Sequence, residues 1–265
     1  MMTLTTKQAL VDWCYAAVTI QALKGKRVVV FGHDSMGMET ALPHIAATRN
    51  QFGIEITRMD MKFLADLLAK ESYDKQELKR LREWLIQGAA GIEIPEASDS
   101  ENLDKSLALY LIVRDLMKEL NAVGGGFMSQ LEWGSDARGI PLPVADIMES
   151  LFNSTFDHNG PKEVIPYATE ADVQALLTQL FMTWLSGGNP PLFMDFRKVW
   201  EPSEIKEFAA SKGVALEGNT PWEQKGFVDG VNSGSASFDW SSNPGTLPRD
   251  ILKKITFPKA VEYFS

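Results

Sequence analysis

Two carboxylates near the ends of neighbouring helical segments are the side chains in this chain best suited to chemistry. Glu149 lies in the helical segment VADIMESLFNS, and Asp172 opens the segment DVQALLTQL. Hard cations such as Mg²⁺ and Mn²⁺ prefer carboxylate oxygens, so two acids that converge could share a divalent ion. The spacing alone leaves another interpretation open, in which Glu149 is a solvated helix residue and Asp172 is a favourable charge in a first helical turn, three positions after Thr169.

The three histidines add little to this hypothesis. They are His33, His44 and His158. His158 stands between the two acids in an Asp-His-Asn-Gly turn, where it could be a third ligand or a solvent-exposed residue.

A glycine-containing loop after an apolar strand raises nucleotide binding as an alternative, because the amides at a helix N-terminus attract phosphate. The loop reads GHDSMG from Gly32 to Gly37, with its glycines five apart and no Walker lysine. Asp34 would also repel a pyrophosphate. The other interpretation is that the two glycines permit a tight turn from strand to helix.

The composition excludes several classes of protein. A formal net charge of -9, with no basic stripe, argues against nucleic-acid binding. No apolar run approaches the roughly 20 residues needed to span a bilayer, and no secretory signal is visible. The single cysteine, Cys14, lies in an apolar helical stretch. It predicts a small core residue in a reducing compartment, so a cytoplasmic protein is expected.

Alternating strand and helix patterns predict an α/β fold. RVVVF at 27–31, GIEITRMD at 53–60 and VGGGF near residue 125 read as strands, with helices expected at 6–24 and 74–88 and from about Asp99 to Asn121. Such alternation predicts a Rossmann-like doubly wound layer.

The pattern changes beyond His158, where EVIPYA and PLFMDFRKVW at 191–200 are expected to be strands. We therefore expect a Rossmann-like domain over residues 1–160, followed by the beginning of a β-rich α+β domain over residues 161–265.

Several segments together resemble the L-fucose isomerase family, and they occur in that family's order across most of the chain. They are FGHDSMGMETA, PVADIMESLFNSTFDHNGPKEV, ATEAD, FMDFRKVW and VNSGSASFD. The resemblance implies an aldose–ketose isomerase, an intramolecular oxidoreductase, that uses Mn²⁺ or another divalent cation. In such an enzyme a proton moves between C1 and C2 of the sugar through a cis-enediol.

Carried over by position, the resemblance makes Glu149 and Asp172 metal ligands that also serve as the acid/base pair, and Met36 a wall of the sugar site. It also implies that the chain is a middle piece. The family's third ligand, a histidine, has no counterpart here, so a complementing chain or a neighbouring subunit of a homo-oligomer would supply it.

Two alternatives to the isomerase stay open at this point. One is a non-catalytic sugar-binding module or inactive fragment, which Mn²⁺ titration would separate from the enzyme. The other is a nucleotide-binding α/β protein that uses the loop after Gly32, which a thermal shift with NAD or ATP would reveal.

Overall fold

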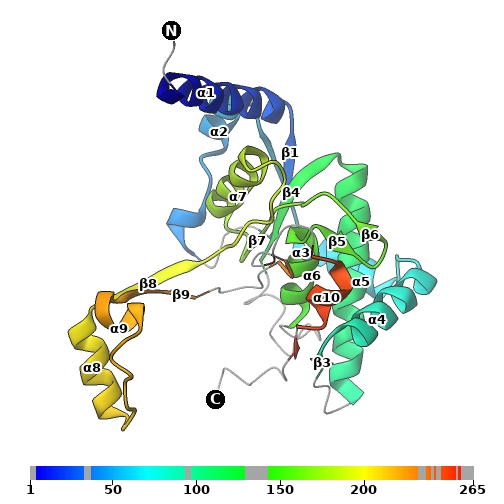
Figure 1. The fold of residues 1–265 in the computed structure, drawn as a ribbon. Coiled ribbons are helices and arrows are strands. Elements are labelled where there is room, and N and C mark those ends of the chain that lie inside the picture. The colour runs from blue at the N-terminus through cyan, green and yellow to red at the C-terminus, as the bar shows by residue number, and fades with distance from the viewer. Residues whose placement is uncertain are drawn as a thin grey trace. The chain divides into compact units, whose positions relative to one another are not determined.

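The computed structural model describes residues 4–32, 37–92, 97–128, 143–231, 237–239, 242, 246–254 and 256–257 (Figure 1). In chain order the elements are α1 (Leu4–Leu23), β1 (Arg27–Phe31), the 3₁₀ helix η1 (Glu39–Ala41), α2 (Ile45–Phe52), β2 (Glu55–Met59), α3 (Met61–Ala69), α4 (Lys75–Gly88), β3 (Gly91–Ile92), α5 (Ala97–Glu119), β4 (Ala122–Phe127), α6 (Pro143–Asn153), β5 (Phe156–Asp157), β6 (Gly160–Pro161), β7 (Tyr167–Thr169), α7 (Val173–Leu185), β8 (Asp195–Trp200), α8 (Pro202–Ser211), α9 (Pro221–Lys225), β9 (Phe227–Val231), α10 (Pro248–Leu252) and β10 (Thr256–Phe257).

A parallel four-stranded sheet forms the centre of the fold, with strand order β2-β1-β4-β7. The apolar run RVVVF becomes β1, which lies between two neighbours and is buried over four of its five residues. A strand covered on both faces needs apolar side chains in both directions, which explains its lack of alternation. The predicted α/β fold is confirmed.

Helices cover both faces of this sheet because the side chains of a strand alternate between faces. Val29, Phe31 and Tyr167 belong to a core cluster that also contains residues of α3, α4, α5 and α6. Val28 and Val30 belong to a second cluster, which contains residues of α7 and the last residue of α1. Figure 1 shows α7 near α1 and α2, with the long helix α5 among the helices of the other group.

Strand β4 has the sequence AVGGGF, and its glycines allow β7 to approach closely. A Cβ atom on Gly125 would lie 2.7 Å from Cε2 of Tyr167, and one on Gly126 would lie 3.2 Å from Cα of Ala171. Both distances are shorter than ordinary carbon contacts. Because the glycines of β4 have no side chains, β7 and the turn after it can pack this closely against the strand.

The chain divides into two compact units, one of residues Met1–Leu192 with Gly234–Ser265 and one of Phe193–Ser233. In the smaller unit, the predicted strand at 191–200 forms as β8 and pairs antiparallel with β9. Strand β7 and helix α7 follow the predicted domain boundary at residue 160. In the larger unit, β7 is nevertheless the fourth strand of the central sheet, and α7 packs on one face of that sheet. The division into domains 1–160 and 161–265 stays a prediction.

Helix α1 differs from its expected packing. Cys14 is exposed, as are Leu10 and Val18, so the prediction of a core cysteine is wrong. Among the residues of this helix whose burial is described, Thr19 and Leu23 are buried, and Leu23 belongs to the second core cluster. Within the described residues, none of the helices is long and apolar enough to cross a membrane.

Candidate metal-binding site

Helix α6 docks against the free edge of β7 through the side chain of Asn153. Gly125 donates its backbone N–H to the carbonyl of Pro166 (2.9 Å), so the next residue, Tyr167, turns its N–H and C=O away from β4. The Asn153 amide donates to the Tyr167 carbonyl (2.8 Å), and its oxygen accepts from the Tyr167 N–H (2.9 Å). Among the described residues no strand pairs with this edge of β7, and the buried Asn153 side chain takes that place and fixes α6 on β7.

Glu149 lies one helical turn before Asn153 and therefore faces the same strand. Its side chain is fully buried, and its Oε2 accepts a hydrogen bond from the Thr169 hydroxyl at 2.7 Å. Thr169, the last residue of β7, is also buried. This contact joins the end of β7 directly to α6.

The short turn after Thr169 brings Asp172 back to the end of the strand. Glu170 and Ala171 have φ of 58° and 57°, the left-handed region that side chains other than glycine rarely adopt. The turn lets the Asp172 N–H donate to the Thr169 carbonyl at 3.0 Å. The cost of about 1–3 kcal/mol per strained residue persists only where the surrounding structure imposes it.

Asp172 is the N-cap of α7, and its Oδ1 accepts from the N–H of Ala175 at 2.8 Å. It precedes the helix, so it does not occupy the first-turn position that the spacing after Thr169 suggested. The residue is half-buried. Thr169 thus contacts both predicted ligands, Glu149 through its hydroxyl and Asp172 through its carbonyl.

The two acids lie at the carboxyl end of the parallel sheet. Thr169 ends β7 opposite Phe127, which ends β4, and β4 ends beside Phe31 of β1. Ligands of open α/β sheets bind outside this edge, so the location suits a binding site. Met36, expected as a wall of the sugar site, follows β1 and lies outside the described residues.

The buried ring of Tyr167 on β7 packs against α6, the helix that carries Glu149. It stacks on Phe152 of α6 with 4.8 Å between ring centroids. Burial, and then the nearby Glu149 carboxylate, raise the pKa of the Tyr167 hydroxyl well above its ordinary value. Tyr167 is therefore neutral and adds no charge beside Glu149.

A lysine closes the C-terminal end of α6. The Lys162 ammonium donates to the carbonyls of Phe152 (2.9 Å) and Ser154 (2.5 Å), which the helix itself leaves without partners. Burial lowers the pKa of Lys162 to about 8, although the carboxylates of Asp157 and Asp239 oppose this shift. The last turn of helix α6 is thus held by both the Asn153 side chain and Lys162.

The donor chemistry of Glu149 and Asp172 fits a hard divalent cation, because each residue contributes carboxylate oxygens. The set is incomplete: the described part of the chain contains no group of three or more His, Cys, Asp and Glu side chains that could hold a metal ion. His44 instead accepts from the N–H of Ala47 as the N-cap of α2.

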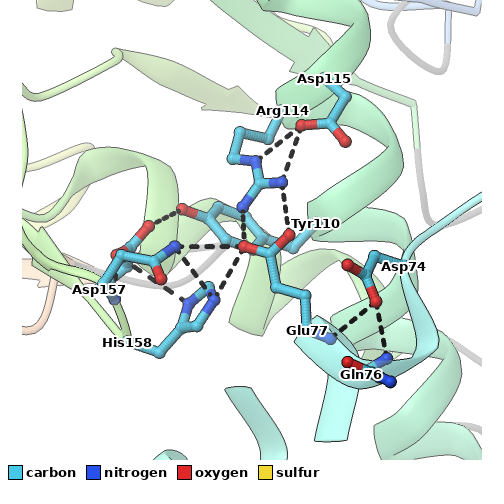
Figure 2. Close-up of polar contacts among 9 residues, drawn as sticks. Asp74, Gln76, Glu77, Tyr110, Arg114, Asp115, Asp157 and His158 are labelled. Carbon is cyan, nitrogen blue, oxygen red and sulfur yellow. Dashed lines mark hydrogen bonds and ion pairs between the residues drawn. The ribbon is translucent and has the colours of Figure 1, made fainter. Parts of the chain in front are cut away.

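His158 is neither exposed nor directed at the two acids. Its side chain is 1% exposed, and its Nε2 lies 3.0 Å from Oε1 of Glu77 on α4. Glu77 also accepts two hydrogen bonds from Arg114 of α5, at 2.5 and 2.9 Å (Figure 2). Asp157 accepts from the Tyr110 hydroxyl at 2.7 Å. The Asp-His-Asn-Gly turn therefore ties β5 to α4 and α5.

This network predicts a pH-dependent stability. Hydrogen bonds from Arg114, and also those from Asn159 and His158, lower the pKa of Glu77 to about 2. An unfolded chain returns this pKa to 4.5, so the stabilisation is complete above that value and is lost as the pH falls towards 2. We expect about 1–3 kcal/mol from this residue after solvent screening.

Urea unfolding between about pH 5 and pH 3 measures this effect. Glu77→Gln should lower the free energy of unfolding at neutral pH and flatten its decline in acid. Glu101→Gln, which removes an exposed carboxylate paired with Lys105, is the control. Equal pH profiles for the two variants would contradict the assignment.

Comparison with known proteins places this geometry in a family. A family model described as the second N-terminal domain of L-fucose isomerase matches residues 26–187, more than half of the chain. The chain belongs to the L-fucose isomerase family. The matched segment begins one residue before β1 and ends two residues after α7, and it contains both Glu149 and Asp172.

Individual relatives agree with this membership. Proteins named L-fucose isomerase from Clostridium perfringens (strain 13 / Type A) and Salmonella choleraesuis (strain SC-B67) are 26% and 27% identical to this chain. Each match covers 88% of this chain, but only 42% and 41% of the respective relative. The chain therefore spans less than half the length of the L-fucose isomerases it matches.

The sequence pointed to the two acids, but not to Thr169, which contacts both of them, or to Asn153, which docks α6 on β7. Asn153 lies four residues after Glu149, so both face β7 on one side of α6. That spacing was visible in the sequence. The docking of α6 on the edge of β7 was not, because the strand has only three residues.

Proposed function

We propose that this chain contributes two carboxylate ligands to the active site of a metal-dependent aldose–ketose isomerase of the L-fucose isomerase type. The observation that carries the proposal is the link from Glu149 through Thr169 to Asp172 at the carboxyl end of the sheet. It is supported by family membership over the segment that contains these residues. We also assign the sheet and its helices to a Rossmann-like domain, followed by a β-rich domain.

The reaction is a proton transfer within the sugar. A divalent cation such as Mn²⁺, held by Glu149 and Asp172, would supply positive charge beside the two sugar oxygens. A carboxylate of the pair takes the proton from C2 of the aldose and returns it to C1, while the hydroxyl proton on O2 passes to O1. The cis-enediol lies between these steps, and no oxidant is consumed. The burial of Glu149 excludes water from the carboxylate and strengthens its electrostatic interactions.

Glu149 and Asp172 alone do not complete the proposed active site. Two carboxylates leave positions open in the coordination shell of a cation that takes six ligands. A histidine from another segment, or from another chain of a homo-oligomer, would occupy one of them, and Met36 would form a wall of the sugar pocket.

Titration calorimetry with Mn²⁺ tests the carboxylate pair. We expect the wild-type chain to bind one Mn²⁺ with a dissociation constant between about 10⁻⁶ and 10⁻³ M, because the ligand set is partial. Glu149→Gln and Asp172→Asn should each weaken binding at least about tenfold, since each removes a charged ligand.

Glu119→Gln is the matched control, because it removes an exposed helix carboxylate at the end of α5. Conversion of L-fucose or D-arabinose to the ketose should follow the same order among the variants. Sugar binding without dependence on Mn²⁺ or on either carboxylate would favour a non-catalytic sugar-binding module.

A further inference from the structure

We propose that Thr169 is a positioning residue that holds Glu149 and Asp172 in register for a shared cation. This inference rests on the proposed function. It assigns to one residue the task of setting the geometry between two ligands that come from different helices.

The hydroxyl of Thr169 controls the orientation of Glu149. A glutamate side chain has three rotatable bonds and loses substantial conformational entropy when it is fixed. The hydrogen bond from Oγ1 to Oε2, at 2.7 Å between two buried side chains, selects one orientation of the carboxylate. The donor itself is confined, because Thr169 is β-branched and lies in a strand that pairs with β4.

The main chain of Thr169 controls the position of Asp172. The Thr169 carbonyl accepts from the Asp172 N–H at 3.0 Å, across the left-handed pair Glu170 and Ala171. Gly126 of β4 leaves room for this turn, since its absent Cβ would lie 3.2 Å from Cα of Ala171. A change at Thr169 that preserves the backbone should therefore act on Glu149 alone.

This arrangement has the form of an outer-shell interaction, in which a hydrogen-bond donor fixes a carboxylate that ligates a metal. Removal of such a partner weakens metal binding by about 10–100-fold in other metal sites. We expect the same range for Thr169→Val, which keeps the branched shape and removes the hydroxyl. Thr169→Ser keeps the hydroxyl and should bind Mn²⁺ within about threefold of wild type.

The chain offers a matched control in Thr183. This residue of α7 is also buried, and among the described residues its hydroxyl has no hydrogen-bond partner. Thr183→Val makes the same chemical change without the contact to Glu149, so it should leave Mn²⁺ affinity unchanged. Circular dichroism of all three variants establishes that they are folded.

A double-mutant cycle separates positioning from a general loss of structure. If Thr169 acts through Glu149, Thr169→Val should weaken Mn²⁺ binding in the wild-type background and have little further effect in Glu149→Gln. Equal weakening in both backgrounds would overturn the inference, as would unchanged affinity of Thr169→Val beside a large loss in Glu149→Gln. The latter result would leave the proposed function standing.

The hydrogen bond between Thr169 and Glu149 can also be tested without metal, by NMR. In the metal-free protein, the ¹³C resonance of the Glu149 carboxyl, assigned by its absence in Glu149→Gln, should shift in Thr169→Val and stay in Thr183→Val. If wild type binds no Mn²⁺, the proposed function fails and the positioning role fails with it. The carboxyl resonance then reports whether the hydrogen bond forms in solution.

Discussion

Asn153→Leu is expected to lower the free energy of unfolding by about 3–5 kcal/mol. The substitution keeps the approximate size of the side chain but leaves the N–H and C=O of Tyr167 buried without hydrogen bonds. Each such group costs about 1–3 kcal/mol. Urea or thermal unfolding monitored by circular dichroism measures the loss.

Gln179 provides an informative control for this substitution. Its amide is buried in α7, and neither its oxygen nor its nitrogen has a hydrogen-bond partner among the described residues. Gln179→Met should therefore be neutral or stabilising, although it too replaces a buried amide by an apolar group. If the Asn153 and Gln179 variants lost equal stability, the proposed sealing of the β7 edge would be refuted.

Gly125→Ala is expected to cost about 2–4 kcal/mol, near the upper end for overpacking of a core. The added methyl group would lie 2.7 Å from Cε2 and 3.0 Å from Cδ2 of Tyr167. The ring cannot move away easily because it stacks on Phe152. Movement of Tyr167 would also displace Thr169, two residues along the same strand, so Mn²⁺ affinity should fall together with stability.

The neighbouring Gly124 gives a graded comparison. A Cβ there would meet the carbonyl of Pro166 at 3.1 Å and a methyl group of Leu176 at 3.2 Å, so Gly124→Ala should be less destabilising. Tyr167→Leu in the Gly125→Ala background should recover part of the lost stability by making room. A Gly125→Ala variant as stable as wild type would show that β4 and β7 are not packed as described.

The parts of the fold that sequence patterns predicted are those governed by local rules. RVVVF predicted β1 with its observed bounds, because a continuous β-branched run suits a strand with two covered faces. Asp74, the first residue of the predicted helix at 74–88, is of a type that caps helices, and its side chain accepts from the N–H groups of Gln76 and Glu77. The end of a buried strand and the start of an exposed helix are both determined within a few residues.

Predictions were incomplete where a distant residue competes with the local rule. Glu77 lies three residues after Asp74, where a glutamate can reach back to the start of its own helix, but its carboxylate binds Arg114, 37 residues away. For His158, either a third metal ligand or a solvent-exposed residue was expected, and it is instead buried against the same Glu77. A charged partner outweighs a local backbone contact when both groups are withdrawn from water.

The same distinction between local and distant interactions applies to the residues of the candidate site. Resemblance and residue chemistry identified Glu149 and Asp172, because carboxylates are conspicuous in a sequence. Thr169 and Asn153 were not identified, because their importance depends on β7 being an edge strand against which α6 packs. That arrangement follows from sheet order, which no local pattern contains.

The left-handed pair Glu170 and Ala171 restricts how this segment can vary. Glycine, asparagine and aspartate tolerate such backbone angles, whereas valine, isoleucine and threonine do not. Two adjacent positions beside the carboxylates therefore disfavour β-branched residues. A valine, isoleucine or threonine at either position should therefore strain the turn that leads to Asp172.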